Sequence, residues 1–202
     1  MLTPVLPLIN ERLGLSLALS GVLGMILSMS NLTQPIMGIW GDRMSRRTLV
    51  TAGALMAAVF IPMLGLAGNF LTLAALLFVG GLGVAAFHPQ SFSLAGELSS
   101  QRRASGIAVF AFAGTLGIGL TPLWIPLLVE NLGIHYLPLA SIPGIVIVAL
   151  VGGFVKDRNP QVIKPQWNAQ FSSLRDSAVP LSLITSVVIL RTVTFLGFGF
   201  YL

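Results

Sequence analysis

The chain has 202 residues, of which 55% are hydrophobic and only 8% are charged, and it contains no cysteine. Soluble domains carry roughly 25% charged residues, so this composition excludes a water-facing surface and a soluble enzyme. The net charge of +5 does not indicate nucleic-acid binding, because the basic residues lie in a few short loops. Without cysteine there is no disulfide framework and no thiolate metal site. We therefore predict an integral membrane protein of the all-α class, a polytopic transmembrane helix bundle.

Runs without charged residues predict the membrane-spanning helices, at roughly 17 to 25 residues per span. One run, residues 48–96, is long enough for two helices, and the turn signal Gly68-Asn69 divides it. Residues 1–9 hold an apolar run that is too short to span. The predicted helices cover residues 15–38, 48–67, 71–97, 104–129, 134–155 and 178–202.

The arginines and lysines predict the orientation of these helices. With the loop at residues 42–47 inside, alternate loops place most of the basic residues inside, leave Arg12 outside and put Arg191 within a span. The positive-inside rule favours this choice, so we expect a multi-pass membrane protein with this loop on the cytoplasmic side.

One long polar connection, residues 156–177, divides the chain. We expect an N-terminal transmembrane block at 1–155, a cytoplasmic linker at 156–177, and the first helix of a second block at 178–202. Within the linker, Trp167, Phe171 and Leu174 recur at helical spacing, which fits a short amphipathic helix on the inner membrane surface. The short length and narrow apolar face also fit a disordered linker.

The loop between the first two predicted spans carries a spaced motif, Gly-Ile-Trp-Gly-Asp-Arg-Met-Ser-Arg-Arg over residues 38–47. Glycine lets another helix approach closely, and a carboxylate at the membrane face is attracted to a helix N-terminus. The arginines can pair with that carboxylate or with lipid phosphates. If the arginines only fixed this loop on the cytoplasmic side, their presence would be explained, but the spacing of the glycines and the aspartate before them would not. The motif residues are Gly38, Gly41, Asp42, Arg43, Arg46 and Arg47.

This spacing resembles the loop between helices two and three of the major facilitator superfamily, Gly-x-x-x-Asp-Arg/Lys-x-Gly-Arg-Arg/Lys. Ser45 stands where the family usually has glycine. The resemblance implies a major facilitator fold, here the end of helix one and helices two to seven. It also implies that Asp42 contacts a later helix and favours the outward-open state. The remaining helices of a C-terminal half would then be partners of this chain.

Further motifs resemble the fosmidomycin-resistance branch of drug efflux transporters within that superfamily. They are Phe87-His88-Pro89, the run Pro-Leu-Ile-Asn-Glu-Arg-Leu-Gly-Leu-Ser at residues 7–16, and an arginine in helix seven, here Arg191. A glycine-rich run also occupies the place of the glycine-proline motif of antiporter helix five, which favours export. Close helix packing explains the same residues, Gly114, Gly117, Gly119 and Pro122.

Two ionisable residues in predicted spans are candidates for the substrate or proton pathway. Histidine changes charge near neutral pH, so His88 fits a group that exchanges a proton for substrate; a neutral histidine that bridges two helices fits equally. Arg191 fits the attraction of an anionic substrate, with a structural salt bridge as the alternative. Gln34 and Gln90 fit hydrogen bonds either to substrate or between helices.

These observations predict a secondary active transporter that exports a small drug-like or anionic compound by alternating access. Its partners would be the lipid bilayer and a small-molecule substrate, and its coupling ion the proton. The resemblance implies that it lies in the inner (plasma) membrane of a bacterium. No cofactor or nucleic acid is expected. The alternatives are a truncated, non-transporting fragment or a half that needs another chain, and an importer of sugars or organic acids. No metal-ligand cluster or catalytic motif is present in the sequence, which argues against an enzyme.

Overall fold

The computed structural model describes residues 2–41, 45–155 and 178–201. It divides into two compact units, Met1–Val162 and Ile163–Leu202. The described residues are helical and contain no strand, which confirms the predicted all-α class. Five of their helical segments are long and apolar enough to cross a membrane, namely Leu17–Gly41, Arg46–Leu66, Phe70–Leu98, Ser100–Leu132 and Ile134–Gly152.

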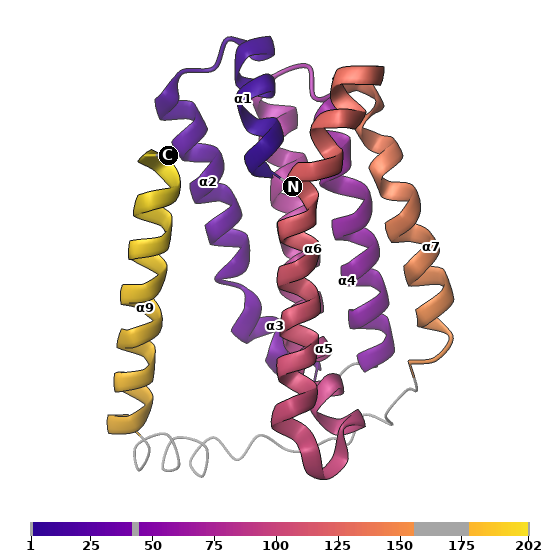
Figure 1. The fold of residues 1–202 in the computed structure, drawn as a ribbon, viewed down its shortest axis with the longest axis vertical. Helices are drawn as coiled ribbons and strands as arrows, with labels where there is room; N and C mark the ends of the chain where they lie inside the picture. The colour runs from indigo at the N-terminus through magenta and orange to yellow at the C-terminus, as the bar shows by residue number, and fades with distance from the viewer. Residues whose placement is uncertain (1, 42–44, 156–177, 202) are drawn as a thin grey trace. The chain divides into compact units, whose positions relative to one another are not determined.

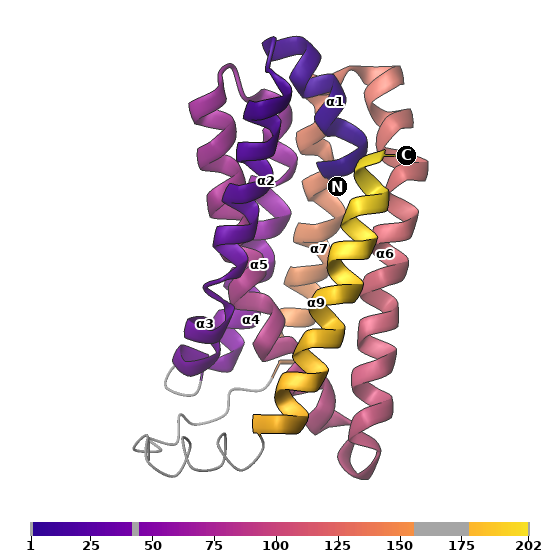
Figure 2. The same cartoon turned by 90° about the vertical axis from the view of Figure 1, so that its left-hand side faces the viewer.

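The helices of the first unit run up and down in chain order (Figures 1 and 2). The α-helices are α1 (Leu2–Leu13), α2 (Leu17–Asn31), α3 (Gln34–Gly41), α4 (Arg46–Phe60), α5 (Phe70–Leu98), α6 (Arg103–Leu132) and α7 (Ser141–Gly152). Three 3-10 helices join them, η1 (Pro62–Leu66), η2 (Ser100–Arg102) and η3 (Ile134–Ala140).

Different turns and 3-10 helices lie at the two ends of this bundle. The turn between α1 and α2 and the 3-10 helices η1 and η3 gather at one end, uppermost in Figure 1, and the turn between α5 and α6 lies at the other. We call them the Arg12 end and the Arg46 end. In the predicted orientation, the Arg12 end faces outward and the Arg46 end faces the cytoplasm.

The buried core lies toward the Arg12 end and draws on six elements. α1 and α2 contribute Ile9 and Leu23, and each is 1% exposed. α5 contributes Leu73 and Leu77, also 1% exposed, while η1, α6 and η3 close the cluster. The complete cluster is Val5, Ile9, Leu23, Leu64, Ala67, Leu73, Leu77, Ile125, Leu137 and Ala140.

An arginine side chain reinforces this end of the bundle. Arg12, in the last turn of α1, donates hydrogen bonds to the carbonyl oxygen of Gly65 at 2.7 Å and to that of Ala67. The carbonyls at the end of a helix lack partners within the helix, so a guanidinium that reaches two of them satisfies both. Arg12 thereby ties α1 to the connection between α4 and α5.

Glycines let α4 and α5 pack closely. A Cβ atom added at Gly53 of α4 would lie 2.8 Å from the Gly83 carbonyl oxygen, and one added at Gly83 would lie 2.7 Å from the Gly53 carbonyl oxygen. α5 also packs against α2, α3 and α6, so it is the central helix of the unit.

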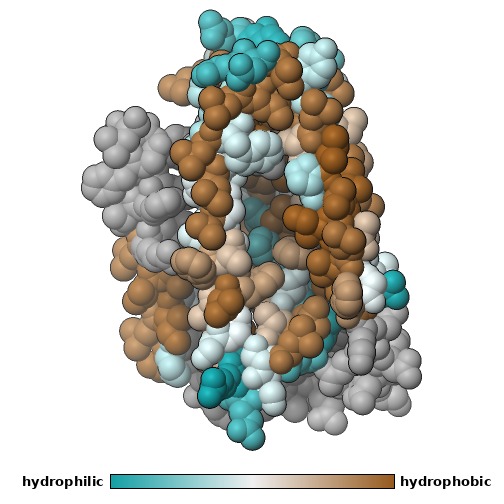
Figure 3. All heavy atoms as spheres, turned by 45° about the vertical axis from the view of Figure 1, so that its right-hand side comes forward, coloured by the Kyte–Doolittle hydropathy of each residue, from teal (hydrophilic) through white to brown (hydrophobic). Residues whose placement is uncertain are grey.

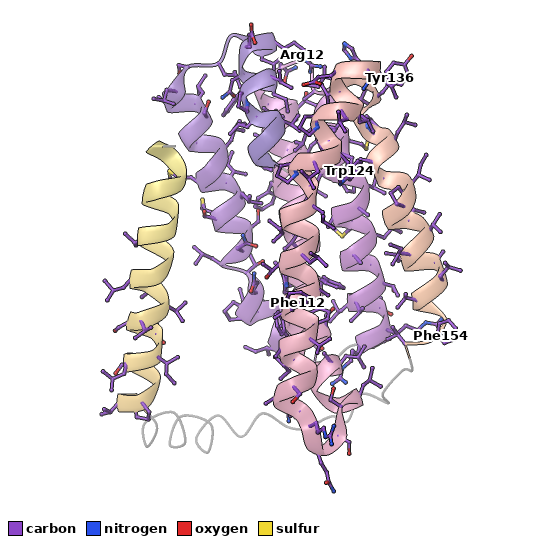
Figure 4. The ribbon with its side chains drawn as sticks, in the orientation of Figure 1. Arg12, Phe112, Trp124, Tyr136 and Phe154 are labelled. Atoms are coloured by element: carbon purple, nitrogen blue, oxygen red, sulfur yellow. The ribbon has the colours of Figure 1, made fainter. Side chains whose placement is uncertain are left out.

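On the face drawn in Figure 3, apolar side chains cover much of the side of the bundle, and hydrophilic ones gather toward its two ends. Phe112 on α6 is 67% exposed and Phe154, after α7, is 83% exposed (Figure 4). In water such surfaces would drive aggregation, whereas lipid tails solvate them. Tyr136 is exposed at the Arg12 end (Figure 4), and tyrosine is enriched where membrane and water meet.

The helix boundaries follow the prediction, with three corrections that involve proline. The predicted helix 15–38 is interrupted at Leu32 and Thr33, because Pro35 in the first turn of α3 clashes with a continuous helix at the carbonyl of Asn31. The segments that begin at Pro62 and that contain Pro138 are 3-10 rather than α-helical. The predicted break at Gly68-Asn69 is confirmed, since the Asn69 side chain caps α5 by accepting from the Thr72 amide at 2.8 Å.

The described part of the second unit is one helix, α9 (Ala178–Tyr201). Arg191 lies past its midpoint, inside the predicted helix 178–202. The predicted linker, residues 156–177, lies outside the described residues.

Candidate functional site

The Arg46 end holds the described part of the spaced motif. Gly38 and Gly41 lie in α3, Arg46 and Arg47 open α4, and Asp42 and Arg43 lie outside the described residues. Ser45 caps α4, because its Oγ accepts a hydrogen bond from the Thr48 amide at 3.2 Å. The serine at the position where the similar motif has glycine therefore caps the start of a helix.

An ion pair joins the beginning of α4 to the end of α5. Arg46 Nη1 lies 2.5 Å from Glu97 Oε2, and Arg46 Nη2 lies 3.1 Å from Glu97 Oε1. Nη2 also donates to Ser93 Oγ at 3.4 Å. The Arg46 side chain is 11% exposed and that of Glu97 is 40% exposed. The two parallel contacts form a bidentate pair, the strongest arrangement of a guanidinium and a carboxylate.

Gln90 connects the motif to α5. Its Nε2 donates to the carbonyl oxygens of Met37 at 3.5 Å and Gly38 at 3.4 Å, and the residue is 5% exposed. A Cβ atom added at Gly41 would lie 1.6 Å from this Nε2, so the missing side chain at Gly41 makes room for the glutamine. Three residues singled out in the sequence, Gly38, Gly41 and Gln90, thus meet at one α3–α5 contact.

His88 lies within α5 in an aromatic setting. Its ring stacks on Phe92 with centroids 6.0 Å apart and meets the edge of Phe87 at 5.8 Å. Both phenylalanines approach Phe110 of α6, at 6.3 Å from Phe87 and 5.0 Å from Phe92. Within the described ranges the structure shows no hydrogen bond from the half-buried His88 ring.

The other predicted residues do not join this group. Gln34 is the first residue of α3, and its Nε2 donates to Asn31 Oδ1 at 3.4 Å. No described atom lies within 4 Å of a Cβ added at Gly114, Gly117 or Gly119, so the packing role of these glycines and Pro122 stays a prediction. Arg191 belongs to the second unit.

Sequence reasoning missed the pairing of Arg46 with Glu97. Glu97 ends the predicted helix 71–97, and Arg46 lies in the loop just before the predicted helix 48–67. An arginine in the first turn of a helix opposes the helix dipole. A carboxylate near such an arginine offsets this repulsion, so a glutamate at the same membrane face is the signal that could have found the pair.

Comparison of the amino-acid sequence with known proteins identifies the family of this chain. A curated protein of Bacillus subtilis (strain 168), described as "Uncharacterized MFS-type transporter YfnC", is 27% identical over 128 residues. The match covers 63% of this chain and 31% of that protein, so the chain spans about a third of the relative's length. The family model of the Major Facilitator Superfamily matches residues 1–202. The chain, with its membrane-length helices and the described part of the family's loop motif, therefore belongs to the Major Facilitator Superfamily.

Proposed function

We propose that the protein is a proton-coupled secondary transporter that moves a small compound across the membrane by alternating access. The family and the membrane-length helices support a membrane transporter. The observation that favours proton coupling is His88, an ionisable ring inside a membrane-spanning helix whose nitrogens bond no described residue. Ionisable residues within membranes face the bundle interior or a water-filled cavity and mark ion pathways.

The cargo proposed is a small drug-like or anionic compound that leaves the cell. The resemblance of Phe87-His88-Pro89 to the fosmidomycin-resistance branch supports export, and a cation at Arg191 would attract an anion. In this proposal His88 carries the exchanged proton and Gln34 lies along the path. Gln90, which bonds the α3 backbone, acts by holding α3 against α5.

Flux measurements in membrane vesicles that contain the protein test this proposal. Two probes are used, the anionic phosphonate fosmidomycin and the lipophilic cation ethidium, each with and without an imposed pH gradient. We expect gradient-dependent movement of one probe, and a loss of at least about tenfold in His88→Gln because an intramembrane ionisable group is removed. Arg191→Gln is expected to weaken transport of the anion more than that of the cation.

The chain offers a matched control for the histidine. His135 in η3 is exposed at the Arg12 end, so His135→Gln removes the second histidine without touching the bundle interior. Equal loss in both variants, or full gradient-driven flux in His88→Gln, would refute the assigned role of His88. The sign of the gradient that drives flux distinguishes export from import.

A further inference from the structure

One face of α5 changes character along its length. Leu73 and Leu77 on this face are buried in the core at the Arg12 end. At 3.6 residues per turn, Ser91 follows Leu73 by about five turns and His88 follows Leu77 by about three turns, so both lie on the same face nearer the Arg46 end. The face therefore passes from apolar to polar inside the membrane-spanning helix.

Ser91 differs from other hydroxyl-bearing residues of these helices. It is 4% exposed, and its buried Oγ has no hydrogen-bond partner among the described residues. Ser30 in α2, which is 0% exposed, donates to the carbonyl oxygens of Ile26 at 3.0 Å and Phe78 at 3.3 Å. Thr121 likewise donates to the Gly117 carbonyl oxygen at 2.8 Å. A buried hydroxyl without a partner is costly, so Ser91 requires one.

The surroundings of Ser91 suit a water molecule. Ser91 and His88 are three residues apart on one helix and are therefore surface neighbours. A buried water needs two to four polar partners; the Ser91 hydroxyl and the His88 ring nitrogens are groups of that kind on one face of α5. The face drawn in Figure 3 has a hollow flanked by apolar side chains, with hydrophilic atoms visible inside it.

We propose that the Ser91 hydroxyl and the His88 ring hold a water molecule inside the helix bundle. Ser91 is then a positioning residue of the pathway, because it hydrates the ring that exchanges the proton. The role in transport rests on the proposed function, whereas the water site itself does not.

Isotope exchange at a single thiol tests the water site. The chain has no cysteine, so Ser91→Cys carries one S–H group whose infrared stretching band is free of overlap from other thiols. The matched control is Ser30→Cys, at a serine that is equally buried but bonded to protein carbonyls. On transfer of the membranes from H2O to D2O, we expect the band of Ser91→Cys to move to the S–D position at least about tenfold faster than that of Ser30→Cys.

Exchange at Ser91→Cys that is no faster than at Ser30→Cys would overturn the proposal. A second variant gives an independent test where the thiol variant does not fold. Removing a buried hydroxyl that has no hydrogen-bond partner stabilises a protein. A raised melting temperature in Ser91→Ala would therefore also overturn the proposal, whereas an unchanged or lowered melting temperature supports it.

Transport by Ser91→Ala and Ser91→Thr separates the water site from the proposed function. We expect Ser91→Ala to slow gradient-driven flux of whichever probe the protein moves, and Ser91→Thr, which keeps the hydroxyl, to restore it. Fast exchange at position 91 together with full flux in His88→Gln would leave the water site standing and refute the proton-coupling role. Fast exchange with full flux in Ser91→Ala would refute the positioning role of Ser91.

Discussion

Arg46 illustrates how a single charge is accommodated at the membrane boundary. It lies in the first turn of α4, where the helix dipole disfavours a cation, and Glu97 neutralises it across the α4–α5 contact. We predict that Arg46→Ala lowers the free energy of unfolding by about 0.5–1 kcal/mol, since the pair is partly exposed. Thermal unfolding of the purified protein in detergent measures the loss.

The neighbouring arginine provides the control for this prediction. Arg47 is exposed, so Arg47→Ala is expected to leave the melting temperature nearly unchanged. A double-mutant cycle with Glu97→Ala isolates the pairwise energy. A coupling energy of zero would mean that the contact between Arg46 and Glu97 contributes nothing to stability.

Arg12 has a larger expected effect because its partners are main-chain carbonyls at the end of a short helix. We predict that Arg12→Ala destabilises the protein by about 1.5–3 kcal/mol, the range for hydrogen bonds to a charged group. Arg12→Lys should recover only part of the loss, because an ammonium group lacks the planar fork that reaches both Gly65 and Ala67. Chemical denaturation provides the measurement, and Glu11→Ala, at an exposed adjacent position, is the control. Full recovery in Arg12→Lys would contradict the forked geometry.

At the scale of elements, the contact between α4 and α5 depends on two glycines that face each other. Alanine at Gly53 or Gly83 would place a methyl group within 2.8 Å of backbone atoms of the other helix, which cannot rotate away. We predict that either substitution destabilises the bundle by about 1–3 kcal/mol, as overpacking does. The melting temperature checks the prediction.

A third glycine supplies the comparison. No described atom lies within 4 Å of a Cβ added at Gly21 in α2, so Gly21→Ala should be neutral or slightly stabilising through helix propensity. Equal effects at Gly21 and Gly53 would show that propensity, and not the close approach of α4 and α5, determines the outcome.

The elements themselves were largely predictable, because a long run without charged residues indicates a membrane-spanning helix and residues such as Asn69 indicate a turn. The interruption of the second span was missed although Pro35 marks it, since a hydropathy reading does not register a proline within an apolar run. The site was less predictable. Whether Gln90 faces a cavity or the backbone of α3 depends on the distance between two helices, which is set by Gly41 some fifty residues away.

At the largest scale, packing and charge are distributed unevenly between the two ends of the first unit. The buried core and Arg12 lie at one end, while the pair of Arg46 and Glu97 lies at the other. Arg102 and Arg103, at the turn between α5 and α6, are also exposed at the Arg46 end. Basic residues favour the cytoplasmic side, so this asymmetry predicts which end faces the cell interior.

Single cysteines introduced into this cysteine-free chain test the orientation. Gln101 in η2 is exposed at the Arg46 end, and His135 in η3 is exposed at the Arg12 end. With a membrane-impermeant maleimide, we expect His135→Cys to react in intact cells and Gln101→Cys to react only after the membrane is opened. Phe112→Cys should stay unlabelled in both conditions, because a thiol in the apolar part of a membrane-length helix does not ionise. The reverse pattern would invert the bundle and place the Arg46–Glu97 pair outside, where the positive-inside rule would no longer explain the arginines around it.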